Sequence, residues 1–269
     1  MNSTSVRAPA VAGAFYRNGA AALRDEIENC FAGVGARGAA PKALVVPHAG
    51  YMYSGRIAAA AYATLKDVRS TVRRVVAIGP SHRVALRGVA IATADAFATP
   101  LGEVPIDAAA RRALIALPGV VASDRAHAFE HSIEVQLPFL QTVLDAFTLV
   151  PLVAGDAEPG DVAAMLERVW GGAETLVVVS TDLSHFHDAS TARALDVRTC
   201  RRILALDATL GGDDACGCVG LDGFLLAARR HALVPRQLAA CNSGDVTGDA
   251  ERVVGYAAFG FYPAANESS

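Results

Sequence analysis

The chain of 269 residues has no excess of charge of either sign: 24 basic residues oppose 27 acidic ones, leaving a formal net charge of −3. This balance excludes the basic surface that nucleic-acid-binding proteins and basic membrane-surface proteins need. No apolar run approaches the ~20 residues of a membrane-spanning helix. The first residues also lack the basic segment followed by a long apolar one that marks a signal peptide. We therefore expect a cytoplasmic protein without a nucleic-acid or membrane partner.

Cysteine is scarce as well. Five cysteines, an odd number, do not form a disulfide framework in a chain of this length. Hydrophobic residues make up 52% of the chain, so a large core is available and needs no covalent cross-links. The cysteines are therefore expected to be reduced. Cys30 and Cys200 lie in helical stretches and are expected to be small core residues.

The motifs of several common enzyme classes are missing. The chain has no G-x-S-x-G elbow, no P-loop, and no G-x-G-x-x-G after a strand. These absences exclude α/β-hydrolases, nucleotide hydrolases and nicotinamide-dependent enzymes. The pair Cys216-Gly217-Cys218 is spaced too closely for an ordinary structural zinc site and has no second pair.

What the chain does contain is an alternation of short β-branched runs and longer stretches with helical periodicity. Strands are expected at 43–47, 73–80, 88–93, 147–155, 174–182, 234–241 and 252–263. Helices are expected at 20–33, 54–66, 108–117, 130–144, 159–169, 190–206 and 222–232, with Ser54 as a cap and Pro138 as a kink. The alternation predicts a single α/β domain over residues 1–269, a layered sandwich with a mostly parallel or mixed sheet covered by helices. The last strand has no helix after it and is expected to be antiparallel or at an edge.

Three of the predicted strands end in loops that carry histidine. His48 follows the first strand, His82 follows the second, and His185 follows the strand at 174–182, which ends in Asp182. Ligands of open α/β sheets bind at the carboxyl ends of the strands, and imidazole is the commonest metal ligand and a good general base. A lone histidine is usually a packing or surface residue. Three at equivalent strand ends predict one shared site.

Two further features leave alternatives open. His127, Glu130, His131 and Glu134 cluster at the start of a predicted helix, but their spacing does not match the H-E-x-x-H motif. They are either part of a site or a polar first turn whose acids favour the helix dipole. Cys241 ends an apolar strand, the same topological place as the histidines, and is either a ligand or one more buried thiol.

Several long motifs, in order along the chain, make the sequence similar to the Memo family, also called AmmeMemoRadiSam system protein B. They are RAPAVAGAFY at 7–16, PHAGYMYSG at 47–55, GPSH at 79–82, EHSIEVQLPFL at 130–140 and STDLSHF at 180–186. The closing GYA at 255–257 resembles the last strand of the family. The resemblance therefore covers essentially the whole chain.

The resemblance implies a fold similar to that of class III extradiol ring-cleaving dioxygenases. In that fold two histidines and a carboxylate hold iron(II), whereas Memo-like proteins carry a His, His and Cys set. Carried over by motif, the metal ligands are His48, His82 and Cys241. Asp182 and His185 then line the same pocket, with His185 at the acid/base position.

A thiolate in place of the carboxylate changes the expected chemistry, because it is a softer ligand that also suits copper(I) or zinc and can itself be oxidised. We expect a mononuclear site for iron(II) or copper, with zinc as an alternative, and a redox role. His185 is expected to move protons or orient a ligand, and Asp182 to orient a histidine or hold a charged group. His131 and Glu134 are further candidates for the pocket wall.

Two other interpretations stay open. One is a non-catalytic module that binds a peptide or a metal, because Memo-like proteins are linked to signalling and phosphopeptide recognition. The other is an extradiol-type dioxygenase acting on a small aromatic, although a fold does not fix a function. The partners that the resemblance suggests are a small-molecule or peptide ligand and, through the alternative family name, a radical-SAM protein.

Overall fold

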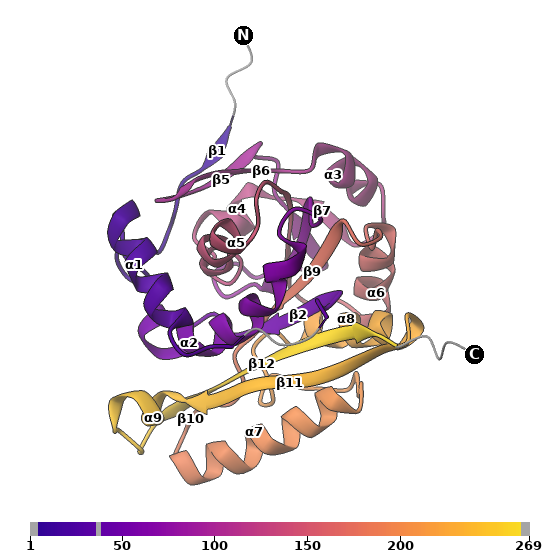
Figure 1. Ribbon diagram of the computed structural model, residues 1–269. Coiled ribbons are helices and arrows are strands. Elements are labelled where there is room, and N and C mark those ends of the chain that lie inside the picture. The colour runs from indigo at the N-terminus through magenta and orange to yellow at the C-terminus, as the bar shows by residue number, and fades with distance from the viewer. Residues whose placement is uncertain (1–4, 36–38, 265–269) are drawn as a thin grey trace, which may run out of the picture.

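A computed structural model describes residues 5–35 and 39–264 of the chain. Within these residues a nine-stranded sheet forms the centre of the molecule (Figure 1). Its strands run in the order β10 (His185–His187), β12 (Val253–Pro263), β2 (Ala43–Val46), β9 (Thr175–Ser180), β3 (Arg74–Pro80), β8 (Thr148–Ala154), β4 (Val89–Ile91) and β7 (Val120–Ala122), and β11 (Leu233–Asn242) pairs with β12. The four central strands β2, β9, β3 and β8 are parallel, so their carboxyl ends meet at one edge.

Helices cover both faces of this sheet. They are α1 (Ala20–Phe31), α2 (Tyr51–Tyr62), α3 (Ala108–Ile115), α5 (Leu137–Val143), α6 (Pro159–Arg168), α7 (Ala189–Leu204) and α8 (Cys218–Arg230). Leu44 and Val46 of β2 pack into one core with α1, α2 and α5, whereas Ala43 and Val45 pack into a second core with α6, α7 and α8. Side chains of a strand alternate between its two faces, so each central strand is buried on both. This confirms the expected layered α/β sandwich.

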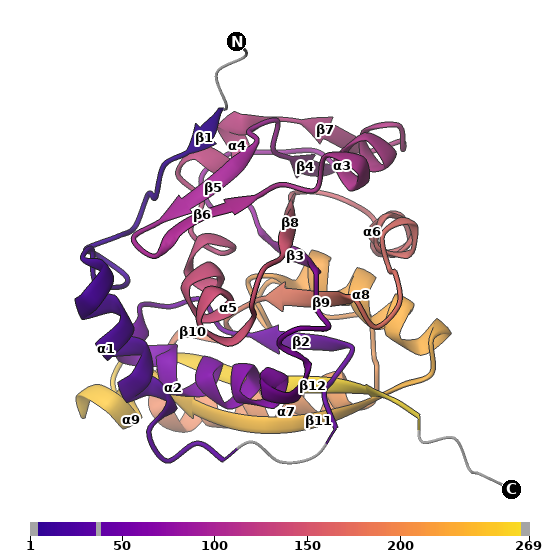
Figure 2. The same ribbon diagram turned by 45° about the horizontal axis from the view of Figure 1, so that its top comes forward.

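A second, smaller sheet has the order β1 (Val6–Arg7), β5 (Ala96–Thr99) and β6 (Gly102–Pro105). Figure 2 shows it at the top of the view, apart from the central strands. The sequence pattern does not predict these three strands, which are two to four residues long. None of the helices in the described ranges is long and apolar enough to cross a lipid bilayer.

The segment 130–144 is not one helix, contrary to the expectation. Glu130 and His131 lie in a loop, and a 3₁₀ turn, η2 (Glu134–Gln136), leads into α5. Pro138 lies in the first turn of α5, where its missing N–H costs no helical hydrogen bond. The proline therefore begins a helix rather than kinking one.

Two helices begin earlier than expected. α2 begins at Tyr51, and the hydroxyl of Ser54 donates to the carbonyl of Ala49 at 3.0 Å instead of capping the helix. α8 begins at Cys218 rather than at 222. Both helices therefore start directly after loops that end at the carboxyl edge of the sheet.

The last strand, β12, is antiparallel to its neighbours, as expected, but it is not at an edge. It pairs with β2 on one side and with β10 and β11 on the other. The hairpin of β11 and β12 thus extends the parallel sheet.

Candidate metal centre

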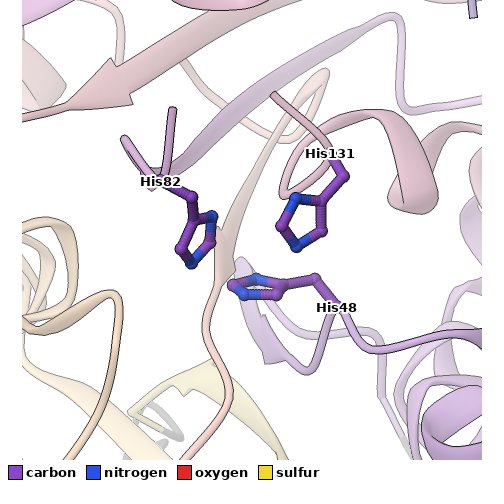
Figure 3. A group of neighbouring side chains, drawn as sticks. All are labelled: His48, His82 and His131. Atoms are coloured by element: carbon purple, nitrogen blue, oxygen red, sulfur yellow. The ribbon is translucent and has the colours of Figure 1, made fainter. Parts of the chain in front are cut away.

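Three imidazoles meet at the carboxyl edge of the central sheet. His48 follows β2, His82 follows β3, and His131 lies in the loop before η2. One ring nitrogen from each lies within 4.8 Å of the others, and we call these three residues the histidine cluster. Their ring centroids are 4.7 to 5.3 Å apart, and Figure 3 shows the rings turned toward a common space. His48 is buried, His131 half-buried and His82 exposed.

Two glycines allow the loops of this site to approach the strand ends. A Cβ atom on Gly79 of β3 would lie 2.5 Å from Oγ of Ser132, so only glycine lets the loop that carries His131 pack there. A Cβ atom on Gly217 would lie 2.8 Å from the carbonyl oxygen of Ser180 at the end of β9. Gly217 therefore allows the loop before α8 to reach the same sheet edge.

A buried carboxylate orients His82. Glu130 Oε1 accepts a hydrogen bond from Nδ1 of His82 at 2.9 Å, and Oε2 accepts one from the His82 backbone N–H at 2.7 Å. Burial alone would raise the pKa of Glu130, but the contacts with His82 and the N–H of Ser132 outweigh it and hold the pKa at about 2. The ionised carboxylate keeps the proton of His82 on Nδ1, which leaves Nε2 as the metal-binding nitrogen.

A hydrogen-bond chain determines the tautomer of His48. Ser180 Oγ lies 2.9 Å from Nδ1 of His48 and donates its own proton to the carbonyl of Ser132 at 2.6 Å. Ser180 also accepts a hydrogen bond from the side-chain amide of Gln136 at 2.9 Å. Because the hydroxyl proton is already used, Nδ1 of His48 must be the donor, and Nε2 carries the free lone pair. Burial, with the neighbouring imidazoles, lowers the pKa of His48 well below its usual value, so the ring is neutral.

The free nitrogen of His48 faces a sulfur and a carboxyl group. Nε2 lies 3.3 Å from Sγ of Cys216 and 4.0 Å from Oδ2 of Asp182. Asp182 Oδ1 accepts the backbone N–H of His48 at 2.7 Å, and the backbone N–H of Asp182 donates to Sγ of Cys216 at 3.3 Å. Burial raises the pKa of Asp182 to about 7 and that of Cys216 to about 12. Asp182 thus lies beside His48.

Sequence reasoning missed Cys216. The C-x-C spacing argues against a structural zinc pair, but it does not exclude one of the two cysteines from a site built by other loops. Cys216 lies two residues before α8, but the sequence predicts that this helix begins at 222, so the position of Cys216 next to the helix start was not visible in the pattern.

His131 completes the cluster. Burial lowers its pKa to about 4, so the ring is neutral. Its Nδ1 is buried without a hydrogen-bond partner among the described residues, 3.4 Å from Oε1 of Glu130. The ring of Phe15 packs against it, with centroids 4.8 Å apart. A buried nitrogen without a partner is costly unless something binds it.

Glu134 does not line the pocket, contrary to the expectation. It is fully buried and pairs with Arg7, and it accepts hydrogen bonds from the hydroxyl of Tyr16 at 2.6 Å and the backbone N–H groups of Ala10 and Val11 at 2.8 and 3.0 Å. All acceptor positions of the carboxylate are used. Glu134 therefore ties the N-terminal segment to the loop of His131.

The two remaining residues of the predicted site lie outside the histidine cluster. His185 is on β10, and burial lowers the pKa of its imidazole. Cys241 is on β11 opposite Tyr256 and lines a separate cavity of about 370 Å³ together with Cys200. Burial, with Asp245 nearby, raises the pKa of Cys241 to about 11, so its thiol is protonated.

The fold and the site define an α/β protein whose parallel strands end in a group of histidines that could hold a metal ion. The chain belongs to the Memo family: the family model of Memo-like proteins matches residues 7–260. A MEMO1 family protein of Methanothermobacter thermautotrophicus is 37% identical over 94% of this chain and 99% of its own length. Relatives from Methanopyrus kandleri and Methanosarcina mazei are 37% and 34% identical, over 95% and 94% of this chain and 98% of their own lengths.

Proposed function

We propose that the protein binds one transition-metal ion through Nε2 of His48, Nε2 of His82 and Sγ of Cys216, a group that we call the proposed metal centre. The observation that carries this proposal is the contact of 3.3 Å between Cys216 and the one free nitrogen of a buried, neutral His48. His131 lies within 4.8 Å of the other imidazoles and can supply a further donor. Imidazole nitrogens with one thiolate suit iron, copper and zinc.

A redox role is the chemistry that this donor set favours. Iron or copper held by imidazoles and a thiolate can exchange electrons, whereas zinc in the same place would act only as a Lewis acid. Asp182, with a pKa of about 7, can hold or release a proton beside His48 near neutral pH. His185 can orient a bound molecule from the neighbouring strand.

The test is anaerobic titration of metal-free protein with Fe²⁺, Cu⁺ and Zn²⁺, together with metal analysis of protein purified without added metal. We expect one ion per chain, and His48→Ala, His82→Ala and Cys216→Ser to lower the affinity by at least about 100-fold, since an outer-sphere partner alone is worth about 10–100-fold. Cys241→Ser is the matched control, because it removes a half-buried thiol from the other cavity. If Cys241→Ser weakens binding and Cys216→Ser does not, the third ligand is Cys241.

Exposure of the loaded protein to oxygen tests the redox role. Reversible oxidation of the bound iron or copper, followed by its absorption spectrum, supports it. A protein that retains only zinc, or that binds a peptide with no change in the metal, favours the non-catalytic interpretation. Oxygen uptake that requires an added small aromatic favours the dioxygenase interpretation.

A further inference from the structure

The cavity of about 370 Å³ that contains Cys241 lies between α7 and the hairpin of β11 and β12, and we call it the α7 cavity. Figure 1 shows α7 running along this hairpin. None of the clustered histidines lines the cavity. Its volume is within the range of about 300–1,000 Å³ that small-molecule sites occupy. The side chains that line it therefore indicate which kind of molecule fits.

The apolar stripe of α7 is only partly buried. Val197, Cys200 and Leu204 line the cavity at positions i, i+3 and i+7, which is the spacing of one helix face. Cys200 is buried in the second core, but Val197 and Leu204 are 45% and 39% exposed. A stripe of this kind normally packs against the core. The two exposed side chains therefore offer apolar surface that a bound molecule can remove from water.

The inner wall of the cavity carries no charge. Burial raises the pKa of the Cys200 thiol to about 12 and that of the Cys241 thiol to about 11, so both are protonated at neutral pH. Burial also raises the pKa of the Tyr256 hydroxyl above its usual range. An uncharged, half-apolar wall accepts the apolar part of a ligand, whereas a charged group would lose its hydration there.

Positive charge lies at the exposed side of the cavity. Arg193 and Arg201, both on α7, are exposed and line it. Arg193 is 3.3 Å from Oδ1 of Asp245 on the short helix α9 (Ser243–Thr247), so its charge is compensated. Arg201 forms no ion pair within the part of the chain that the structure describes.

The other acid of the lining does not reach Arg201 as an ion pair either. Oδ1 of Asp196 accepts the backbone N–H of Ser184 at 3.0 Å. The carboxylate of Asp196 also occupies the space that a Cβ atom on Gly255 of β12 would fill. Asp196 is thus held by backbone groups of neighbouring segments. The guanidinium of Arg201 is left to bind an anion from solution.

We propose that the α7 cavity is a second ligand site, which binds a small amphipathic carboxylate with its apolar chain against Val197 and Leu204 and its carboxylate on Arg201. Arginine suits this group because its planar guanidinium donates two parallel N–H bonds to a carboxylate. The site is separate from the proposed metal centre, and binding to it does not require a metal.

The test compares three probes with the same alkyl chain and different head groups: octanoate, 1-octanol and octylammonium. Their affinities for the metal-free full chain are measured by calorimetry. We expect octanoate to bind most tightly, and Arg201→Gln to lower its affinity about five-fold while the affinity for 1-octanol stays unchanged. Arg230→Gln is the matched control, because Arg230 is an exposed arginine at the end of α8 that does not line the cavity.

Two further measurements locate the bound molecule. Ala240 is an exposed residue of β11 that lines the cavity, and Ala240→Phe should fill it and abolish binding of octanoate and 1-octanol. Aromatic residues suit strands, so this variant should keep the melting temperature of the parent. In the parent protein, octanoate should also slow alkylation of Cys241 but not of Cys218, a half-buried thiol on α8.

Several outcomes would overturn the proposal. Octylammonium that binds as tightly as octanoate, or an equal loss of octanoate and 1-octanol in Arg201→Gln, contradicts recognition of a carboxylate. Binding that persists in a folded Ala240→Phe, or that leaves Cys241 unprotected, places the ligand elsewhere. A concentration-dependent dimer that Ala240→Phe disperses shows that a second copy of the chain covers this face instead.

The test is independent of the proposed metal centre. His48→Ala, which removes a proposed metal ligand, should bind octanoate as the parent does. If Ala240→Phe fails to fold, protection of Cys241 and the response of Arg201→Gln still decide the outcome.

Discussion

Sγ of Cys216 lies 3.3 Å from Nε2 of His48, although 168 positions separate the two residues in the chain. The contact joins the loop after β2 to the loop before α8. It places a thiol beside the only nitrogen of His48 that hydrogen bonding to Ser180 leaves free. The following expectations depend on this arrangement and on the buried groups around it.

Metal affinity should rise with pH because of Cys216. Burial raises the pKa of this thiol to about 12, so a metal must displace its proton throughout the neutral range. The neutral rings of His48 and His131 add no such competition. We expect the association constant for Zn²⁺ to increase about tenfold per pH unit between about pH 6 and 8. Competition with a chelator at three pH values measures how the association constant changes with pH. Cys216→Ser should remove this pH dependence. A pH dependence that persists in the variant would assign the displaced proton to another group.

Glu130→Gln should weaken metal binding about 10–100-fold without unfolding the protein, because the carboxylate keeps the proton of His82 on Nδ1. The side-chain amide of glutamine has only one oxygen acceptor. Its NH₂ group would therefore face Nδ1–H of His82 or the backbone N–H of Ser132, and two donors cannot form a hydrogen bond with each other. The measurement is a Zn²⁺ titration with a melting curve for each variant. Glu167→Gln is the control, since Glu167 also contacts an imidazole, Nε2 of His231 at 2.8 Å, outside the histidine cluster. Equal affinities for Glu130→Gln and the parent would contradict the orienting role.

Arg7→Met should lower the free energy of unfolding by about 3–5 kcal/mol, because it leaves the fully buried carboxylate of Glu134 without its countercharge. Urea denaturation measures the change. Arg69→Met is the matched control: Arg69 and Asp145 form an exposed pair at 2.9 Å, worth about 0–1 kcal/mol. Similar losses in the two variants would show that burial of the Arg7 pair has no special effect.

Acid should destabilise the protein partly through His127. Burial lowers the pKa of this imidazole from 6.5 to about 4, so the unfolded chain binds the proton more readily than the folded one. Its contribution to stability is complete above about pH 6.5 and is lost as the pH falls toward 4, by up to about 3 kcal/mol.

The variant that tests this expectation is His127→Gln, which removes the titration and retains a donor for the carbonyl of Ala90. Urea denaturation of parent and variant is compared from about pH 7 to pH 4. The parent should lose stability more steeply over this range. Parallel curves would show that other groups cause the acid sensitivity.

Much of the architecture follows from local pattern. The runs that end at His48, His82 and Asp182 are apolar on both faces, which only a strand covered by two helical layers can satisfy. Parallel strands bring their carboxyl ends to one edge, so the strand pattern alone predicts that His48 and His82 converge. The same segments carry the resemblance to the Memo family, which the comparisons confirm.

Other features depend on contacts between distant segments, which no local pattern contains. Glu134 pairs with Arg7 across 127 positions, so its place in a polar turn does not show whether it lines a pocket or anchors the N-terminal segment. Which of Cys216 and Cys241 lies beside His48 likewise depends on contacts between distant segments. Both lie next to elements near the sheet edge, but only the packing of the loop before α8 against β9 brings one sulfur to His48.

The amino-acid sequence is thus sufficient to specify the central strands, the two helical layers and two of the three clustered histidines, because periodicity and burial are local properties. It is not sufficient to specify which sulfur, which third imidazole and which carboxylate accompany them. Glu130 and His131 reach the site on the loop before η2, and Cys216 reaches it on the loop before α8. Their positions are therefore consequences of how the strands and helices pack in three dimensions.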